Sequence, residues 1–317
     1  MTSGALTLPE GVLRVIEPPE GARPTDYGAD RLEVQSRSAL AHTQWARFGV
    51  TAARHFDTPA PSALIHLPRA KDAARAAIAQ AAHDVDLLII DGQKTDGIES
   101  ILKAVKARAE ILGVVSKAHG KTFWFASKGT DFSDWKGAPR EVAGGFMTLP
   151  GVFSADGPDK GSEALVDALP ALSGHVVDLG GGWGFLARHV LTNPEVTHLD
   201  LVEEDADALT CARQNLPDPR AAFHWGDATI FKSARLVDHV VMNPPFHKGR
   251  NGVPALGMAF IRQAATILAP TGTLWLVANR HLPYEDELGR AFREVEALTG
   301  TQSFKVIRAA KPHRQKR

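Results

Sequence analysis

The most informative stretch of the chain is Val177-Asp178-Leu179-Gly180-Gly181-Gly182-Trp183-Gly184. An apolar run of strand type ends in an acidic residue, and glycines then stand at alternate positions before a helical pattern. Glycine tolerates positive φ and lets the backbone approach a ligand that a Cβ would exclude. The helix that follows would present free N–H groups and its positive dipole end to a negatively charged group. These features predict a nucleotide-like cofactor without identifying it.

Carboxylates follow the glycine loop at positions that suit a nucleoside. Glu203 ends the next predicted strand, where a carboxylate accepts hydrogen bonds from ribose hydroxyls. Asp227, followed by Ala228, ends the strand after that, and its carboxylate can accept from the exocyclic amine of adenine. Asp205 is expected to cap the next helix. Because residues 182–187 also fit the dinucleotide fingerprint in its alanine form, a nicotinamide oxidoreductase stays open at this point.

A second motif, Asn243-Pro244-Pro245-Phe246, directly follows a predicted strand. Two prolines fix φ and remove two N–H donors, which leaves backbone carbonyls beside the side-chain amide oxygen of Asn243. Such acceptors suit a planar NH₂ group and can orient its lone pair towards an electrophile, while Phe246 stacks on the ring that carries the amine. We therefore predict that these four residues form the catalytic group. A nicotinamide enzyme would give them no role.

The length and patterning predict two α/β units. A chain of 317 residues exceeds the usual size of one domain. Strand and helix candidates alternate along it, which indicates mostly parallel sheets with helices on their faces. The Gly/Pro/Asp-rich segment 149–162 is the best boundary. In the first unit we expect strands at 63–67, 86–90, 111–115 and 122–126 and helices at 71–83 and 97–109; in the second we expect strands at 176–179, 198–202, 222–225, 239–242, 273–277 and 303–307 and helices at 162–169, 185–191, 205–215, 256–268 and 285–292.

Composition excludes several classes of protein. Lys plus Arg and Asp plus Glu both number 36, so the chain is not a globally basic nucleic-acid binder. The single cysteine, Cys211, excludes a disulfide framework, and the thirteen histidines show no metal-ligand spacing, so we expect no metal. We find no membrane-length apolar run and no signal peptide, and we expect a cytoplasmic protein without a membrane partner. Acidic residues stop at Glu296, and the basic segment after Pro312 is expected to contact RNA phosphates.

The two motifs together resemble those of class I S-adenosylmethionine (SAM)-dependent methyltransferases that act on an exocyclic or amide nitrogen. Further runs narrow the resemblance to the rRNA (guanine-N2-)-methyltransferases of two types, type C for the small ribosomal subunit and type G for the large one; these runs are 149–154, 161–162, 243–249, 277–284 and 304–306. The resemblance covers roughly residues 149–310 and is weak before them. Two positions depart from the family pattern, since Gly181 stands where Cys or Ala is common and Trp183 is bulkier than usual.

The resemblance implies two tandem Rossmann-like methyltransferase units in an α/β fold. Residues 1–145 would form a degenerate unit with a helper role in RNA binding or stability, consistent with the lack of an alternate-glycine loop after Asp91. Residues 146–317 would form the catalytic unit, with a seven-stranded, mostly parallel sheet and a basic C-terminal tail.

The resemblance also implies the reaction. SAM would be held by Asp178, Gly180, Gly182, Gly184, Glu203, Asp227 and Ala228. Its methyl group would pass to the N2 of a guanine in ribosomal RNA, either free or in a partly assembled subunit. The open alternatives are methylation of adenine N6 or of a protein glutamine amide, and an inactive RNA-binding or assembly factor.

Overall fold

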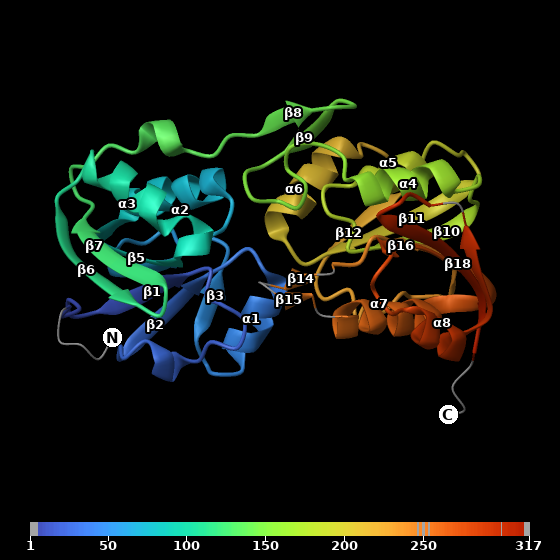
Figure 1. Ribbon diagram of the computed structural model, residues 1–317, viewed down its shortest axis with the longest axis horizontal. Helices are drawn as coiled ribbons and strands as arrows, with labels where there is room; N and C mark the ends of the chain where they lie inside the picture. Colours follow the sequence, from blue (N-terminus) through green and yellow to red (C-terminus); the bar gives the residue numbers. More distant parts are fainter. Residues whose placement is uncertain (1–5, 246, 249–250, 253, 299, 314–317) are drawn as a thin grey trace. The chain divides into compact units, whose positions relative to one another are not determined.

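The computed structural model describes residues 6–245, 247–248, 251–252, 254–298 and 300–313, and the chain divides into two compact units (Figure 1). The first comprises the chain up to Pro139 together with Leu149–Gly151. The second comprises Arg140–Thr148 and the chain from Val152 onward. Arg140–Thr148 contains an antiparallel hairpin of β8 (Arg140–Val142) and β9 (Phe146–Thr148), and the expected boundary between residues 145 and 146 falls inside it.

The first unit is built on a seven-stranded sheet of order β3-β2-β1-β4-β5-β7-β6. Its first five strands are parallel, and β7 is antiparallel to both neighbours. The strands are β1 (Val12–Ile16), β2 (Arg31–Gln35), β3 (Thr51–Ala53), β4 (Ala60–His66), β5 (Val85–Gln93), β6 (Ile111–Lys117) and β7 (Gly120–Ala126). The helices are α1 (Ala39–Ala46), α2 (Lys71–Asp84) and α3 (Ile98–Lys106), with 3₁₀ turns at Pro24–Asp26, Lys94–Asp96 and Ser133–Trp135.

Helix α3 illustrates how the sequence places these elements. Ile98, Ile101, Leu102 and Val105 recur at helical spacing and are all buried, as their periodicity predicted. They pack into a core on one face of the sheet together with α2 and the inward residues of β4, β5 and β7.

The second unit has a seven-stranded sheet of order β12-β11-β10-β13-β16-β18-β17. Its strands are β10 (Gly174–Leu179), β11 (Val196–Glu203), β12 (Ala221–Trp225), β13 (Val237–Met242), β16 (Leu268–Asn279), β17 (Phe292–Leu298) and β18 (Phe304–Pro312), with β14 (His247–Lys248) and β15 (Asn251–Gly252) forming a separate pair. Its helices are α4 (Lys160–Ala168), α5 (Phe185–Val190), α6 (Ala206–Asn215), α7 (Pro254–Ile267) and α8 (Glu285–Ala291).

The helices of the second unit cover both faces of its sheet. Helices α4, α5 and α6 pack on one face, and α7 and α8 pack on the other (Figure 1). The first five strands of the sheet are parallel, and β18 is antiparallel to both β16 and β17. None of the described helices in either unit combines the length and the apolar character needed to cross a membrane.

Numbered within each unit, both sheets have the strand order 3-2-1-4-5-7-6. This confirms the prediction of two tandem Rossmann-like units and of a seven-stranded, mostly parallel second sheet. In open sheets of this kind, ligands bind beyond the carboxyl ends of the strands where the order reverses. In the second unit that point lies between β10 and β13, and the glycine loop and Asn243 directly follow these two strands.

The same topology corrects one sequence interpretation. Asp91 lies in β5, which is the counterpart of β16 and not of β10. The strand that corresponds to β10 in the first unit is β1, and the segment after it, residues 17–21, contains one glycine, Gly21. The first unit therefore also lacks alternate glycines after β1, which is where a counterpart of the glycine loop would stand.

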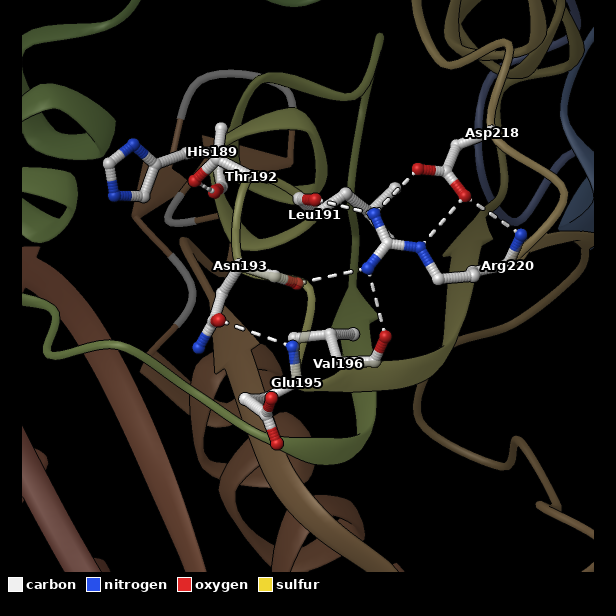
Figure 2. Close-up of polar contacts among 8 residues, drawn as sticks. All are labelled: His189, Leu191, Thr192, Asn193, Glu195, Val196, Asp218 and Arg220. Carbon is white, nitrogen blue, oxygen red and sulfur yellow. Dashed lines mark hydrogen bonds and ion pairs between the residues drawn. The ribbon is translucent and has the colours of Figure 1, made fainter.

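Arg220 fastens the turn before β11 to the start of β12, as Figure 2 shows. Its guanidinium donates to the carbonyl oxygens of Leu191, Asn193 and Val196 at 2.6, 2.9 and 2.9 Å. It also donates to both carboxylate oxygens of Asp218, at 3.0 and 2.7 Å. All five N–H groups of the guanidinium thus have acceptors, which lysine could not provide.

Basic residues near the C-terminus are part of the sheet. Lys305 is buried in β18 and pairs with Glu285. Lys311 and Arg308, also in β18, both face Glu294. These cations are paired with carboxylates, so a basic tail begins only after β18. The remaining basic residues of that tail lie outside the described part of the chain.

Candidate functional site

The glycine loop adopts a backbone that its alternate glycines permit. Gly180, Gly182 and Gly184 have φ angles of 72°, 54° and 92°, a region that residues with a Cβ rarely enter. A Cβ on Gly182 would meet no atom within 4 Å, so the backbone there faces open space. A Cβ on Gly184 would lie 2.9 Å from the side chain of Leu216. The loop thus forms a cradle at Gly182 and packs tightly at Gly184.

Gly181 has a different reason for being glycine. It does not share the positive φ of the glycines on either side. A Cβ at this position would lie 2.6 Å from Cγ of Leu201 and 3.0 Å from Oδ2 of Asp178. The lack of a Cβ at Gly181 therefore allows the loop to pack closely against β11.

Asp178 lies fully buried beneath the loop. Neither of its carboxyl oxygens has a partner in hydrogen-bond geometry among the described residues. Burial raises the pKa of Asp178 to about 8; the charge of Glu203 adds to the rise, and the backbone N–H of Ala187 acts against it. A buried carboxyl without a well-formed hydrogen bond, placed under a loop that faces open space, is typical of a functional site.

Glu203 contacts the loop directly. Its Oε2 accepts from the backbone N–H of Gly182 at 2.8 Å, and its Oε1 accepts from that of Asp205 at 2.8 Å. Burial raises the pKa of Glu203 to about 7, and the nearby charge of Asp205 also raises it. Each carboxylate oxygen keeps a further lone pair, so the group can accept more hydrogen bonds. Asp205 caps α6, as the sequence predicted.

Asp227 and Ala228 do not line the small pocket at the ends of β10 and β13; of the predicted cofactor residues only Gly180 and Gly182 line it, and Asp178, Gly184 and Glu203 do not. Asp227 accepts from the backbone N–H and the hydroxyl of Thr229, at 2.8 and 2.6 Å, in a turn after β12. Ala228 is buried in the core under α7. Their contact with the adenine part of a cofactor stays a prediction.

A small pocket at the carboxyl ends of β10 and β13 brings the two sequence motifs together. Both the glycine loop and the residue that opens the second motif line it. The lining residues are Phe153, Ser154, Asp159, Ser162, Gly180, Gly181, Gly182, Trp183, Phe185, Leu186 and Asn243.

The side chain of Asn243 is held in one orientation. Its Nδ2 donates to Oδ2 of Asp159 at 2.8 Å and to Oγ of Ser162 at 3.0 Å. An ionised carboxylate can only accept, so the amide nitrogen and not the oxygen must face Asp159. Both amide hydrogens are thereby used, and Oδ1 has no hydrogen-bond partner among the described residues. Asn243 therefore offers a fixed acceptor.

Asp159 and Ser162 are site residues that the sequence analysis missed. Asp159 is the N-cap of α4 and accepts from the backbone N–H groups of Gly161 and Ser162, at 2.9 and 3.0 Å. An acidic N-cap directly before a helix is visible in the sequence. Its other role, as the acceptor that orients the amide of Asn243, is not visible in the sequence because Asn243 lies 84 residues away.

Of the other three residues of the second motif, the structure describes the two prolines. Pro244 is buried and Pro245 is exposed. Phe246, predicted to stack on the substrate ring, lies outside the described residues.

Trp183 forms a wall of the pocket. Its Nε1 donates to the carbonyl oxygen of Phe153 at 2.9 Å. Its ring packs against those of Phe146 and Phe185, with centroids 4.9 and 5.8 Å away. The indole is thus buried and does not point outward.

Comparison with known proteins shows the family to which the second unit belongs. Residues 143–308, just over half of the chain, match the model of the methyltransferase small domain. The chain is 37% identical over 162 residues to the ribosomal RNA small subunit methyltransferase C of Psychromonas ingrahamii, a match that covers 50% of this chain but only 46% of that protein. It is 36% identical over 167 residues to the ribosomal RNA large subunit methyltransferase G of Pseudomonas fluorescens, covering 50% of this chain and 44% of that protein.

Longer matches extend into the first unit. The small subunit methyltransferase C of Hahella chejuensis is 29% identical over 268 residues, which cover 78% of this chain and 76% of that protein. Among solved structures, a 16S rRNA N2 methyltransferase of T. thermophilus, in complex with AdoMet and guanosine, superposes with a TM-score of 0.80 at 24% identity. That match covers 96% of this chain and 90% of the other, and it shows that both units share the fold of that protein.

Proposed function

Because the chain belongs to the family of the methyltransferase small domain, we propose that it transfers the methyl group of S-adenosylmethionine to the N2 amine of a guanine in ribosomal RNA. One observation carries the proposal: the amide of Asn243 is fixed as an acceptor in the pocket that the glycine loop also lines. The relatives named as rRNA methyltransferases, and the T. thermophilus protein with AdoMet and guanosine, support the choice of cofactor and base.

The residues present fit SAM as the cofactor. Gly182 leaves room for a ligand against its backbone, and the free lone pairs of Glu203 suit ribose hydroxyls. Asp178 sits under the same loop with unused carboxyl oxygens. Asp227 and Ala228 would lie on the adenine side. When bound, SAM supplies an electrophilic methyl group on a sulfonium, so the protein mainly has to align the amine.

Asn243 would provide that alignment. The lone pair of a guanine amine is delocalised into the ring, which makes the amine a poor nucleophile. Oδ1 of Asn243 and the carbonyl oxygen of Pro244 would accept the two amine hydrogens and stabilise the positive charge that develops on nitrogen. Asp159 and Ser162 would keep Oδ1 turned to the substrate. The methylated amine would then carry one excess proton, which it would release to water, so a dedicated general base is not needed.

The substrate would be ribosomal RNA, either free or in a partly assembled subunit, in the cytoplasm. A base in helical RNA must be splayed out or already unpaired to enter such a pocket. The first unit would not bind SAM and would instead widen the RNA footprint or stabilise the second unit.

A deletion strain tests the proposed function. Ribosomal RNA from the strain and its parent is digested and compared by nucleoside mass spectrometry. Loss of one N2-methylguanosine, restored by the intact chain but not by Asn243→Ala, supports the proposal. Loss of N6-methyladenosine, loss of a methylated glutamine in a protein, or unchanged methylation contradicts it.

A further inference from the structure

A second cluster of ligand-type side chains lies in the second unit, at the other end of β10 from the glycine loop. His175 stands at the start of β10, His198 and Asp200 lie in β11, and His224 lies in β12. The three strands are parallel neighbours, and His175 is directly paired with His198. Because side chains alternate along a strand, these four residues share one face of the sheet. The cluster does not contribute to the pocket described above.

Asp200 is the centre of this cluster. Its carboxylate oxygens lie 2.7, 3.3 and 2.6 Å from the Nε2 atoms of His175, His198 and His224. Three imidazole nitrogens thus surround one carboxylate.

The cluster is accessible from one side. The side chains of His175 and Asp200 are 6% and 8% exposed, whereas those of His198 and His224 are 38% and 40% exposed. The two outer histidines line a pocket of about 540 Å³. An ion can thus reach the buried carboxylate past the outer imidazoles.

We propose that His175, His198, Asp200 and His224 bind one divalent transition-metal ion of the zinc type. Imidazole nitrogens and a carboxylate oxygen are donors that Zn²⁺ takes in tetrahedral sites, at about 2.0–2.2 Å. Donors at that bond length stand roughly 3.3 Å from one another. The donor atoms of His175, His198 and Asp200 already lie within 4.8 Å of one another. Small side-chain shifts therefore suffice to place an ion between these three, and His224, whose Nε2 lies 2.6 Å from Oδ1 of Asp200, would be the fourth donor.

The sequence could not indicate this site. It contains no pair of histidines at the spacing of a known metal motif, and for that reason we expected no metal. The donors come from three strands and meet only through the register of the sheet. An ion held there would link β10, β11 and β12 and stabilise the folded unit independently of the proposed methyl transfer.

Arg235, in the position that it has in this structure, disfavours metal binding at His175. Its Nε donates to Nδ1 of His175 at 3.3 Å, so the proton of that imidazole is on Nε2, facing Asp200. Binding through Nε2 moves the proton to Nδ1, and Arg235 must then turn away. Arg235 is exposed and can do so, and Lys232 on the pocket rim adds positive charge. Removing the charge of Arg235 should therefore tighten metal binding.

The test uses the full chain without a histidine tag, treated with a chelator. Zn²⁺ is titrated against a chelating indicator, and Co²⁺ is added separately to record its visible absorption. His198→Gln and His224→Gln alter the exposed donors, Arg235→Gln removes the opposing charge, and His189→Gln changes an exposed histidine elsewhere in the same unit. Circular dichroism establishes that each variant is folded.

We expect one Zn²⁺ per chain, a Co²⁺ spectrum of tetrahedral type and higher thermal stability with zinc. Loss of either exposed donor should weaken binding more than about 100-fold, beyond the effect of losing an outer-shell partner. Arg235→Gln should tighten binding, and His189→Gln should leave it unchanged. Absence of stoichiometric binding, or equal affinity in His198→Gln, His224→Gln and the parent, would overturn the proposal and leave the cluster as a hydrogen-bonded network only.

Discussion

The amide nitrogen of Asn243 lies 2.8 Å from the carboxylate of Asp159, which also caps the helix α4. One carboxylate thus fixes both the start of a helix and the direction of the proposed catalytic amide. We expect Asp159→Asn to uncouple these roles, because asparagine is an equally good N-cap but also presents N–H donors that permit Asn243 to turn over.

Asp159→Asn should therefore lower kcat by about 10-fold or more, the scale of one lost charge-assisted hydrogen bond, with SAM affinity nearly unchanged. Steady-state methylation and calorimetry of SAM binding measure the two effects. Glu163→Gln, an exposed change on the same helix, is the control. An unchanged kcat in Asp159→Asn would remove Asp159 from the positioning of Asn243.

Alanine at Gly182 should chiefly impair SAM binding, whereas alanine at Gly181 should chiefly lower the stability of the fold. At Gly182 the new Cβ faces open space, so the fold should lose only about 1–2 kcal/mol for its positive φ, while SAM binding should fail. At Gly181 the new Cβ collides with Leu201, and we expect about 1–3 kcal/mol of lost stability from overpacking. Urea unfolding and SAM calorimetry on both variants separate the two effects. A Gly182→Ala protein that binds SAM normally would show that the cradle is not the cofactor site.

Asp178 should make the protein less stable as the pH rises. Its pKa is about 8 in the folded chain, above the value of an unfolded aspartate, so the folded state binds the extra proton. Below about pH 4 the carboxyl is protonated in both states and does not change the free energy of unfolding. Between about pH 4 and pH 8 it lowers that free energy progressively.

Asp178→Asn, which removes this titration, should exceed the parent in free energy of unfolding at pH 8 by at least about 1 kcal/mol, with a smaller difference at pH 5. Urea denaturation at the two pH values measures the change. A difference between variant and parent that is the same at both pH values would mean that Asp178 does not titrate in this range.

Arg220→Lys should lower the melting temperature without changing methylation at a permissive temperature. Lysine keeps the charge but cannot supply five N–H groups to Asp218 and the 191–196 turn. Arg293→Lys, at an exposed position of β17, is the matched control. Equal melting temperatures for the two variants would show that the hydrogen bonds of Arg220 in Figure 2 do not contribute to stability.

The sequence predicted those parts of the fold whose signals are local. The glycine loop, the helix α3 and the Asp205 cap each follow from residues close in the chain, and all three are observed. The strands β1, β2 and β3 were not predicted. Strand β17 was also missed, because it is mostly exposed and has no apolar run.

The sequence could not predict relationships that arise from distant segments. Asn243 meets Asp159 only because β13 ends beside the start of α4, and the histidine cluster depends on the register of three strands. The orientation of Trp183 depends on Phe146 in the hairpin, a segment assigned no structure from its sequence. The counterpart of the glycine loop in the first unit was sought after the wrong strand, because β1, which corresponds to β10, was not predicted.

We propose that Asn243 directs a guanine amine to the methyl group of SAM. The most direct measurement incubates the purified chain with isotopically labelled SAM and ribosomal RNA from the deletion strain, followed by nucleoside mass spectrometry. We predict label in N2-methylguanosine at one position with the intact chain, and less than about 1% of that rate with Asn243→Ala, the scale of a lost transition-state donor or acceptor, although that variant still binds SAM. Label in another nucleoside, or full labelling by Asn243→Ala, would contradict the proposed mechanism.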